Sequence, residues 1–321
     1  MALQNKNVLV TGGAGFIGSA LVRLLLKGKA NVTVLDNFLS GRRSNLKELE
    51  GSIEIVEGSI LGENLAETLS SRNIGFVLNL AAEPYIPKCY ETPRSFFEIN
   101  ALGALNVMLA CKEAGITRIV QYSSSEVYGS ALKTPMDETH PTLPRSTYAV
   151  SKLAADRLCY TLNHEQGLPV VILRQFNVFG PRETHPYIIP ELISQLSSTE
   201  KITLGNIKAS RDFTYVEDAA RAAMLLLECK NAEGEAVNCG FGKDYTVEEM
   251  AEITAEVVGQ KKPNITIDQK RIRPLDVQCL RADYSKLNKL TGWEPKVSFR
   301  EGLERTVAWF RENNNKWVWE E

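Results

Sequence analysis

The chain has 321 residues and a formal net charge of −2 at pH 7, with basic and acidic residues interspersed along it. This length suits one large α/β unit or two domains, and the charge makes neither nucleic acid nor an anionic membrane an evident partner. Phosphate-bearing ligands remain open, because they need only local cations.

Six cysteines occur without C-x-x-C pairs, and three histidines lack metal-ligand spacing. We therefore expect neither disulfides nor a metal site. There is no basic segment followed by an apolar leader, and no apolar run of about 18 residues that could cross a bilayer. A reduced, cytoplasmic location is the expectation that follows.

The N-terminal stretch predicts a strand, a tight turn and a helix. Asn7 to Val10 is apolar, TGGAGFIG follows directly, and Ser19 to Leu26 has a helical apolar pattern. Glycines at positions 12, 15 and 18 permit a tight turn, close approach of a pyrophosphate, and close packing of the helix on the strand. The free N–H groups at the start of the helix favour phosphate. The pattern predicts a dinucleotide site.

A second strand, Asn31 to Leu35, ends at Asp36. A carboxylate here suits the ribose hydroxyls of adenosine and repels a ribose 2′-phosphate, so we predict NAD rather than NADP. Arg42 and Arg43 leave an alternative open, since arginines after this strand can also receive a 2′-phosphate.

Strands and helices then alternate, which predicts a doubly wound parallel sheet with ligands beyond the carboxyl ends of its strands. The expected strands are 53–56, 76–80, 118–122 and 170–173, and the expected helices are 64–71, 94–114 and 148–166. We expect residues 1–178, with a return segment at about 212–237, to form an NAD-binding Rossmann domain. Residues 179–211 and 238–321 then form a smaller, mixed substrate domain.

The stretch from Gln121 to Lys152 carries the candidate chemistry. Ser124 and Glu126 follow an apolar strand, and Tyr148 and Lys152 lie four apart on one helical face. A tyrosine base at neutral pH needs its pKa lowered from about 10, and a shift of about 3 units corresponds to about 4 kcal/mol. A desolvated lysine and an oxidised nicotinamide could together supply this stabilisation.

The C-terminal third is less regular. Thr246 and Glu249 predict a capping box before a helix to Val258. Arg211, Arg271 and Arg273 are candidate diphosphate ligands, because a guanidinium matches phosphate oxygens, although ion pairs within the protein are the alternative for each. An amphipathic helix is expected at 303–310, and the tail after it is not expected to fold.

Read in order, TGGAGFIG, LDN, LAAEP, YSSSEVYG, YAVSK, LRQFNVFGP, RDFTYVED and RPLDVQCLRADYSKLNKLTGWEP resemble the extended short-chain dehydrogenases/reductases that act on nucleotide sugars. The resemblance spans residue 7 to about residue 310. Within that family the chain is most similar to NAD-dependent 4,6-dehydratases of the UDP-N-acetylhexosamine type and, more distantly, of the GDP-mannose type. Glu126 carries this choice, because 4-epimerases usually have a small or neutral residue at this position, whereas dehydratases and UDP-glucuronate decarboxylases have glutamate.

The resemblance implies catalytic roles for Ser124, Glu126, Tyr148 and Lys152. It implies NAD contacts at Gly12, Gly15, Phe16, Ile17, Gly18, Asp36, Asn37, Ser59, Ile60, Leu80, Ala81, Ala82, Asn100, Ser123, Tyr148, Lys152, Phe176 and Val178. It implies contacts to a nucleotide-diphosphate sugar at Glu83, Ser124, Ser125, Asn177, Arg211, Arg273 and Asp276. Ser59, Gln175 and Ser124 depart from the family pattern, where aspartate, an aromatic residue and threonine are common.

By this resemblance Tyr148 takes the proton of the sugar C4 hydroxyl while NAD takes the C4 hydride, Ser124 holds the same oxygen, and Lys152 holds the nicotinamide ribose. Glu126 then removes the C5 proton, water leaves from C6, and the hydride returns to C6. Because Ser125 stands where some dehydratases have an acidic donor, Glu126 could serve as base and acid.

Three other functions remain open. A 4-epimerase would use Tyr148 and NAD but not Glu126, a UDP-glucuronate decarboxylase would release a C5 carboxylate, and a non-enzymatic NAD-binding regulator would be expected to have lost Tyr148 or Lys152. Family members pair their two long helices across a dimer, so the resemblance also implies a homodimer.

Overall fold

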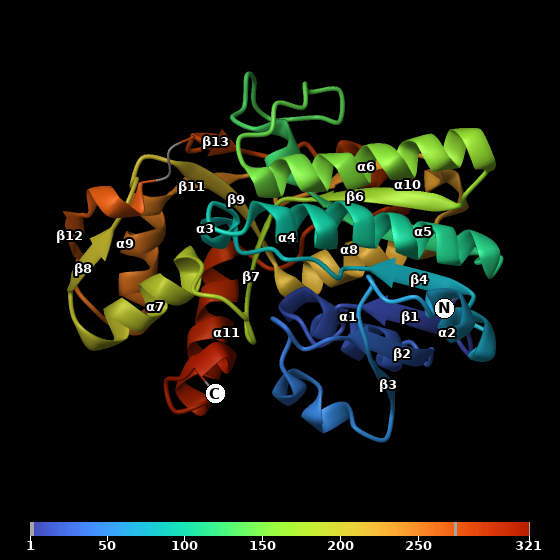
Figure 1. Cartoon of the computed structure of the whole chain (residues 1–321). Helices are drawn as coiled ribbons and strands as arrows, with labels where there is room; N and C mark the ends of the chain where they lie inside the picture. Colours follow the sequence, from blue (N-terminus) through green and yellow to red (C-terminus); the bar gives the residue numbers. More distant parts are fainter. Residues whose placement is uncertain (1–2, 273–274, 321) are drawn as a thin grey trace.

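The computed structural model describes residues 3–272 and 275–320. Its centre is a parallel seven-stranded sheet (Figure 1). In spatial order the strands are β10 (Ala236–Cys239), β6 (Val170–Gln175), β5 (Arg118–Ser124), β4 (Phe76–Asn79), β1 (Asn7–Thr11), β2 (Asn31–Asp36) and β3 (Glu54–Glu57). The chain adds strands on one side of β1 as far as β3 and then continues on the other side of β1, starting with β4. This change of side between β1 and β4 is the mark of a doubly wound sheet, so the predicted sheet is confirmed.

Helices cover both faces of this sheet (Figure 1). Val8 and Val10 of β1 face a core shared with α1 (Phe16–Lys27), α8 (Val216–Glu228) and α10 (Ser285–Thr291). Leu9 between them faces a second core shared with α2 (Leu65–Ser71), α5 (Gly103–Glu113) and α6 (Thr147–Gln166). Alternate strand residues are therefore buried on opposite faces, which explains the continuous apolar runs of the sequence.

The helix predicted at 94–114 is present but is not uniform. It consists of α4 (Pro93–Phe97), a π-helical segment (Glu98–Leu102) and α5. Asn100 lies in the π-helical segment, where its side chain bonds to the backbone of Glu83 and to Ser151. The wider π-helical turn changes the direction of the Asn100 side chain within an otherwise continuous helix.

The rest of the chain forms a second layer system, on the left in Figure 1. One small sheet has the order β11 (Asp244–Thr246), β9 (Ser210–Tyr215), β13 (Cys279–Leu280), with β7 (Asn177–Phe179) also pairing β9, and a second sheet pairs β12 (Asn264–Ile267) with β8 (Lys201–Leu204). The helices of this region are α7 (Ile188–Ser198), α9 (Val247–Val258) and α11 (Phe299–Glu312). The short helix α3 (Ile86–Cys89) packs instead against α4 and α6. The capping box of Thr246 and Glu249 is confirmed at the start of α9. The division into two domains stays a prediction.

The expectation that the C-terminal tail does not fold is wrong. Helix α11 runs on to Glu312, and the Trp317 side chain beyond it is only 1% exposed. Trp317 contacts Phe310 and Trp319, and its indole N–H donates to Ser194 Oγ over 2.8 Å. Burial of these large aromatic side chains holds the C-terminal tail in place, although its three consecutive asparagines suggest a loop.

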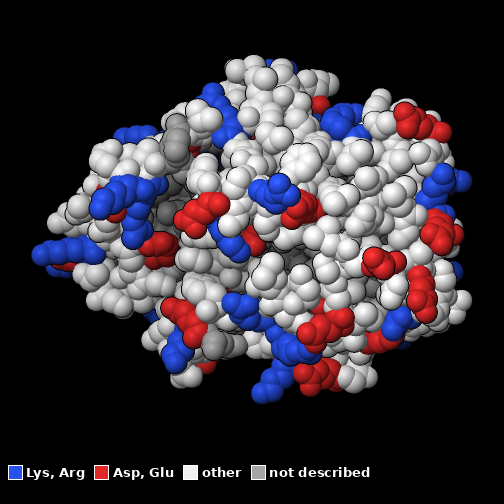
Figure 2. Space-filling view, in the orientation of Figure 1, with Lys and Arg blue, Asp and Glu red and all other residues white. Residues whose placement is uncertain are grey.

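Charged side chains of both signs are intermixed on the face seen in Figure 2. Within the described ranges, none of the helices combines the length and the apolar character needed to cross a membrane. Over the same residues, four cysteines are buried and two are partly buried, and all six are free thiols.

Candidate active site

A cavity of about 900 Å³ opens beyond the carboxyl ends of the parallel strands and reaches the second sheet. It brings together most of the residues singled out from the sequence. Those that line it are Gly12, Gly15, Phe16, Ile17, Gly18, Asp36, Asn37, Ser59, Ile60, Leu80, Ala81, Ala82, Ser123, Ser124, Ser125, Glu126, Tyr148, Lys152, Phe176, Asn177, Val178, Arg211 and Asp276.

Two predicted contact residues lie behind the cavity wall. Glu83 is 3% exposed, its carboxylate accepts a bond from Lys88 Nζ at 3.0 Å, and its backbone N–H donates to Asn100 Oδ1 at 2.8 Å. Asn100 in turn donates to Ser151 Oγ on α6. The Asn100 side chain therefore links the loop after β4 to α6, and the Glu83 carboxylate links this loop to α3. Arg273 lies outside the described residues.

The glycine-rich turn forms a cradle that other residues could not. Gly12 has a φ of +68°, and a Cβ there would lie 2.9 Å from the backbone nitrogen of Ala81. A Cβ on Gly18 would lie 2.1 Å from the carbonyl oxygen of Gly12. Among the described residues no side chain caps α1, and the residues at the start of this helix, Gly15 to Gly18, line the cavity. This arrangement suits a pyrophosphate.

Asp36 is held in place by the backbone. Its carboxylate accepts hydrogen bonds from the N–H groups of Ala14 at 2.9 Å and Phe38 at 2.8 Å. Burial raises its pKa from the ordinary value, while these two bonds act in the opposite direction. The carboxylate keeps further lone pairs for ribose hydroxyls.

The arginines that follow Asp36 are engaged elsewhere. Arg43 pairs with Glu57 and stacks over the Phe38 ring at 4.1 Å. Arg42 donates to the carbonyl oxygen of Gly41 and does not line the cavity. The alternative of a 2′-phosphate held by Arg43 would therefore require that residue to leave its carboxylate partner.

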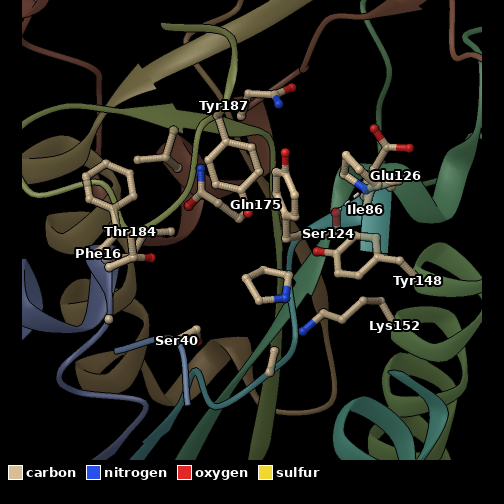
Figure 3. Close-up of a pocket in the computed structure, with 18 of the residues that line it drawn as sticks. Phe16, Ser40, Ile86, Ser124, Glu126, Tyr148, Lys152, Gln175, Thr184 and Tyr187 are labelled. Atoms are coloured by element: carbon tan, nitrogen blue, oxygen red, sulfur yellow. Dashed lines mark hydrogen bonds between the residues drawn. The ribbon is translucent and has the colours of Figure 1, made fainter. Parts of the chain in front are cut away.

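Three candidate catalytic groups meet at the end of β5. The Ser124 hydroxyl lowers the pKa of the neighbouring Tyr148 phenol and accepts the backbone N–H of Glu126 at 3.2 Å. Glu126 is 8% exposed, and its negative charge acts on Tyr148. Figure 3 shows Ser124, Glu126 and Tyr148 on the same side of the pocket. The group can therefore handle protons at two neighbouring positions of a ligand.

The ionisation of Tyr148 differs from the expectation. Burial raises its pKa to about 12, the negative charge of Glu126 acts in the same direction, and the Ser124 hydroxyl only partly opposes them. Lys152 is 4% exposed, burial lowers its pKa to about 8, and its ammonium donates to the backbone carbonyl of Tyr122. Positive charge brought beside the phenol would lower the pKa of Tyr148.

The far end of the cavity carries the candidate diphosphate ligands. Arg211 is 9% exposed, and its guanidinium lies 3.6 Å from Asp276, which also accepts a bond from Asn206. Arg271 lines the cavity too, but it forms a 2.6 Å ion pair with Glu191 of α7. Arg211 and Arg271 would thus have to leave, or share, carboxylate partners to bind phosphate.

The sequence did not reveal an aromatic group that lines the cavity near Tyr148. Tyr85, from the loop after β4, stacks on His185 at 5.2 Å and contacts Tyr187 at 5.7 Å. Tyr85 and Tyr187 line the cavity, and the pKa of Tyr187 is raised by burial and by the neighbouring Tyr148. They lie in irregular loops, where periodicity carries no signal.

The model of the protein family described as GDP-mannose 4,6 dehydratase matches residues 9–306. The chain belongs to this family. The predicted membership among the extended short-chain dehydrogenases/reductases is thereby confirmed.

Members similar to this chain are named for several reactions. A putative UDP-glucose 4-epimerase from Methanocaldococcus jannaschii is 33% identical and covers 96% of this chain and 99% of its own length. A UDP-N-acetyl-alpha-D-glucosaminuronate decarboxylase from Bacillus cytotoxicus is also 33% identical, over 97% of this chain and 100% of its own. The human dTDP-D-glucose 4,6-dehydratase is 30% identical, over 97% of this chain and 92% of its own length.

Solved structures of a dehydratase and of an epimerase are similar to this chain to about the same degree. The Streptomyces venezuelae dTDP-glucose 4,6-dehydratase DesIV, with NAD and TYD bound, has a TM-score of 0.89 and 32% identity over 97% of this chain and 98% of its own. The Thermus thermophilus UDP-glucose 4-epimerase complex with NAD has a TM-score of 0.87 and 32% identity, over 95% of this chain and 99% of its own. The family members thus act on nucleotide sugars as dehydratases, epimerases or decarboxylases.

Proposed function

We propose that this protein is an NAD-dependent nucleotide-sugar 4,6-dehydratase. The observation that carries the proposal is the buried Glu126 carboxylate beside the Tyr148 and Ser124 pair. Oxidation at C4 needs only the tyrosine and serine, whereas a carboxylate next to them is what removal of a C5 proton requires. NAD as cofactor is supported by the glycine cradle, the uncapped first turn of α1 and Asp36, and by neighbours solved with NAD.

In this proposal Tyr148 accepts the proton of the C4 hydroxyl, and Ser124 holds the same oxygen. When bound, NAD supplies a two-electron oxidation at C4, the matching reduction at C6, and a positively charged ring that favours the Tyr148 phenolate. Lys152 binds the nicotinamide ribose. The C4 ketone acidifies the C5 proton, Glu126 removes it and gives a proton to the departing C6 hydroxyl, and water leaves. Reduction at C6 and return of a proton from solvent to C5 through Glu126 then give the 4-keto-6-deoxy sugar.

The division of the chain follows the same proposal. The parallel sheet with α1 and Asp36 holds NAD, and the region around β9 and β13 holds the nucleotide. Arg211 is the proposed diphosphate ligand, with Asp276 and Asn206 beside it orienting the nucleotide. The 4-epimerase and the decarboxylase are the competing functions, since relatives named for them have similar identity.

The test uses purified protein with a panel of UDP, GDP and dTDP sugars and two near-isosteric variants. Tyr148→Phe should abolish C4 oxidation and every product. Glu126→Gln cannot accept the C5 proton, so it should lose elimination by a factor on the order of 10² while still accumulating NADH absorbance and an enzyme-held 4-keto sugar. Unchanged turnover of Glu126→Gln to a C4 epimer would replace the dehydratase by the epimerase, and carbon dioxide from a uronic acid would replace it by the decarboxylase.

A further inference from the structure

Helix α6 meets β5 at three successive turns. Tyr148 lies beside Ser124, Lys152 donates to the carbonyl oxygen of Tyr122, and Asp156 accepts the Ser123 hydroxyl at 3.1 Å. The three helix residues are spaced by four, and the three strand residues are consecutive. The first two contacts hold the proposed catalytic groups, and the third holds neither.

The third contact is fixed by a buried ion pair. Asp156 is fully buried and Arg174 is 3% exposed. Arg174 Nε lies 2.8 Å from Asp156 Oδ2, and Nη2 lies 3.0 Å from Oδ1, so the fork is bidentate. Arg174 is the β6 residue paired with Ser123 of β5. Bidentate geometry admits one relative placement of the two groups.

The arginine itself cannot swing away. Its Nη1 donates to the Tyr128 hydroxyl at 3.0 Å, and its guanidinium lies 5.0 Å from the centre of that ring. Tyr128 in turn donates to Asn238 of β10 at 2.7 Å. Hydrogen bonds and the ion pair therefore fix the position of Asp156 on α6 relative to three neighbouring strands of the sheet, β5, β6 and β10.

We propose that the Arg174–Asp156 ion pair is a positioning device that sets the register of α6 on β5, and so the placement of Tyr148 against Ser124. Ser123 is part of this device: its hydroxyl donates to Asp156, although the resemblance assigns it to the cofactor. A buried ion pair adds little to stability compared with apolar packing, and its best-attested use is to fix a register. The inference rests on the proposed function only in taking Tyr148 as the C4 base.

The test compares two buried aspartates on helices. Asp218 of α8 is 3% exposed, pairs with Arg221 and accepts the backbone N–H groups of Lys296 and Val297, but it does not line the cavity. Asp156→Asn should lower kcat for C4 oxidation by about 10- to 100-fold with KM within about twofold, because small misplacements of reacting groups cost rate rather than binding. Asp218→Asn should lose comparable thermal stability and keep kcat within about twofold.

Ser123→Ala provides a variant that leaves the ion pair and the fold intact. It should lower kcat about three- to tenfold while leaving the melting temperature and the calorimetric NAD affinity unchanged, and Asp156→Glu should recover part of the kcat lost in Asp156→Asn. Equal kcat losses for Asp156→Asn and Asp218→Asn at equal loss of stability would overturn the proposal. So would an unchanged kcat, or a tenfold weaker NAD affinity, in Ser123→Ala. Because C4 oxidation is common to dehydratase, epimerase and decarboxylase, this result is independent of which product forms, and NAD binding by the wild-type protein checks the cofactor separately.

Discussion

Asp36 should make this protein discriminate strongly against NADP. Its carboxylate cannot turn away from a ribose 2′-phosphate, because the N–H groups of Ala14 and Phe38 hold both oxygens. A phosphate of charge about −1.5 with its phosphorus about 4 Å from a carboxylate oxygen is repelled by about 1.6 kcal/mol at a dielectric constant of about 80, and by about 6 kcal/mol at about 20. NAD should therefore bind at least about tenfold more tightly than NADP.

The assay is isothermal titration calorimetry of NAD and NADP with the wild-type protein and with Asp36→Asn. The variant removes the charge and should bring the two affinities within about threefold of each other. Its amide nitrogen would face a backbone donor, so its stability should fall by about 1 to 3 kcal/mol, which thermal unfolding would register. Equal affinities of the wild-type protein for NAD and NADP would refute the reasoning.

Three further predictions concern charge, assembly and the tail. Burial lowers the pKa of Lys152 to about 8, so its ammonium is present below that pH and lost above it. The affinity for NAD, measured by calorimetry, should therefore fall between pH 7 and pH 9.5 in the wild-type protein but not in Lys152→Met. Leu102 and Leu109 are each 47% exposed on the helix beside α6, so we expect this helix to form a homodimer interface. Light scattering at micromolar concentration should show a dimer for the wild-type protein and a monomer for Leu102→Glu. A monomeric wild-type protein would contradict this. Trp317→Ala should lower the free energy of unfolding by about 3 to 5 kcal/mol in denaturant titration, whereas a loss below about 1 kcal/mol would mean that the tail does not pack as described.

The parts of the site that were predictable from the sequence are those that local geometry determines. A glycine at a position with positive φ, an uncapped helix start and an acidic residue at a strand end belong to one continuous strand–turn–helix–strand unit, residues 7–36, so their pattern specifies their arrangement. The spacing of Tyr148 and Lys152 is likewise a property of one helix. These residues all line the cavity.

What could not be predicted depends on contacts between distant segments. Tyr85 and Tyr187 meet across about a hundred residues, and nothing in either loop indicates the other. The burial that raises the pKa of Tyr148 is also a tertiary property, as is the engagement of Arg271 by Glu191. The tail was expected not to fold, although the alternating tryptophans of WVWE were an available signal of a packed segment.

The most direct test of the proposed dehydration follows the product in deuterated water by NMR. A nucleotide sugar that the wild-type protein converts should lose its C6 hydroxyl, gain a C4 ketone, and carry deuterium from solvent at C5, because the C5 proton passes through Glu126. A product that keeps its C6 hydroxyl, has no deuterium at C5 and differs from the substrate only in the configuration at C4 would contradict the account.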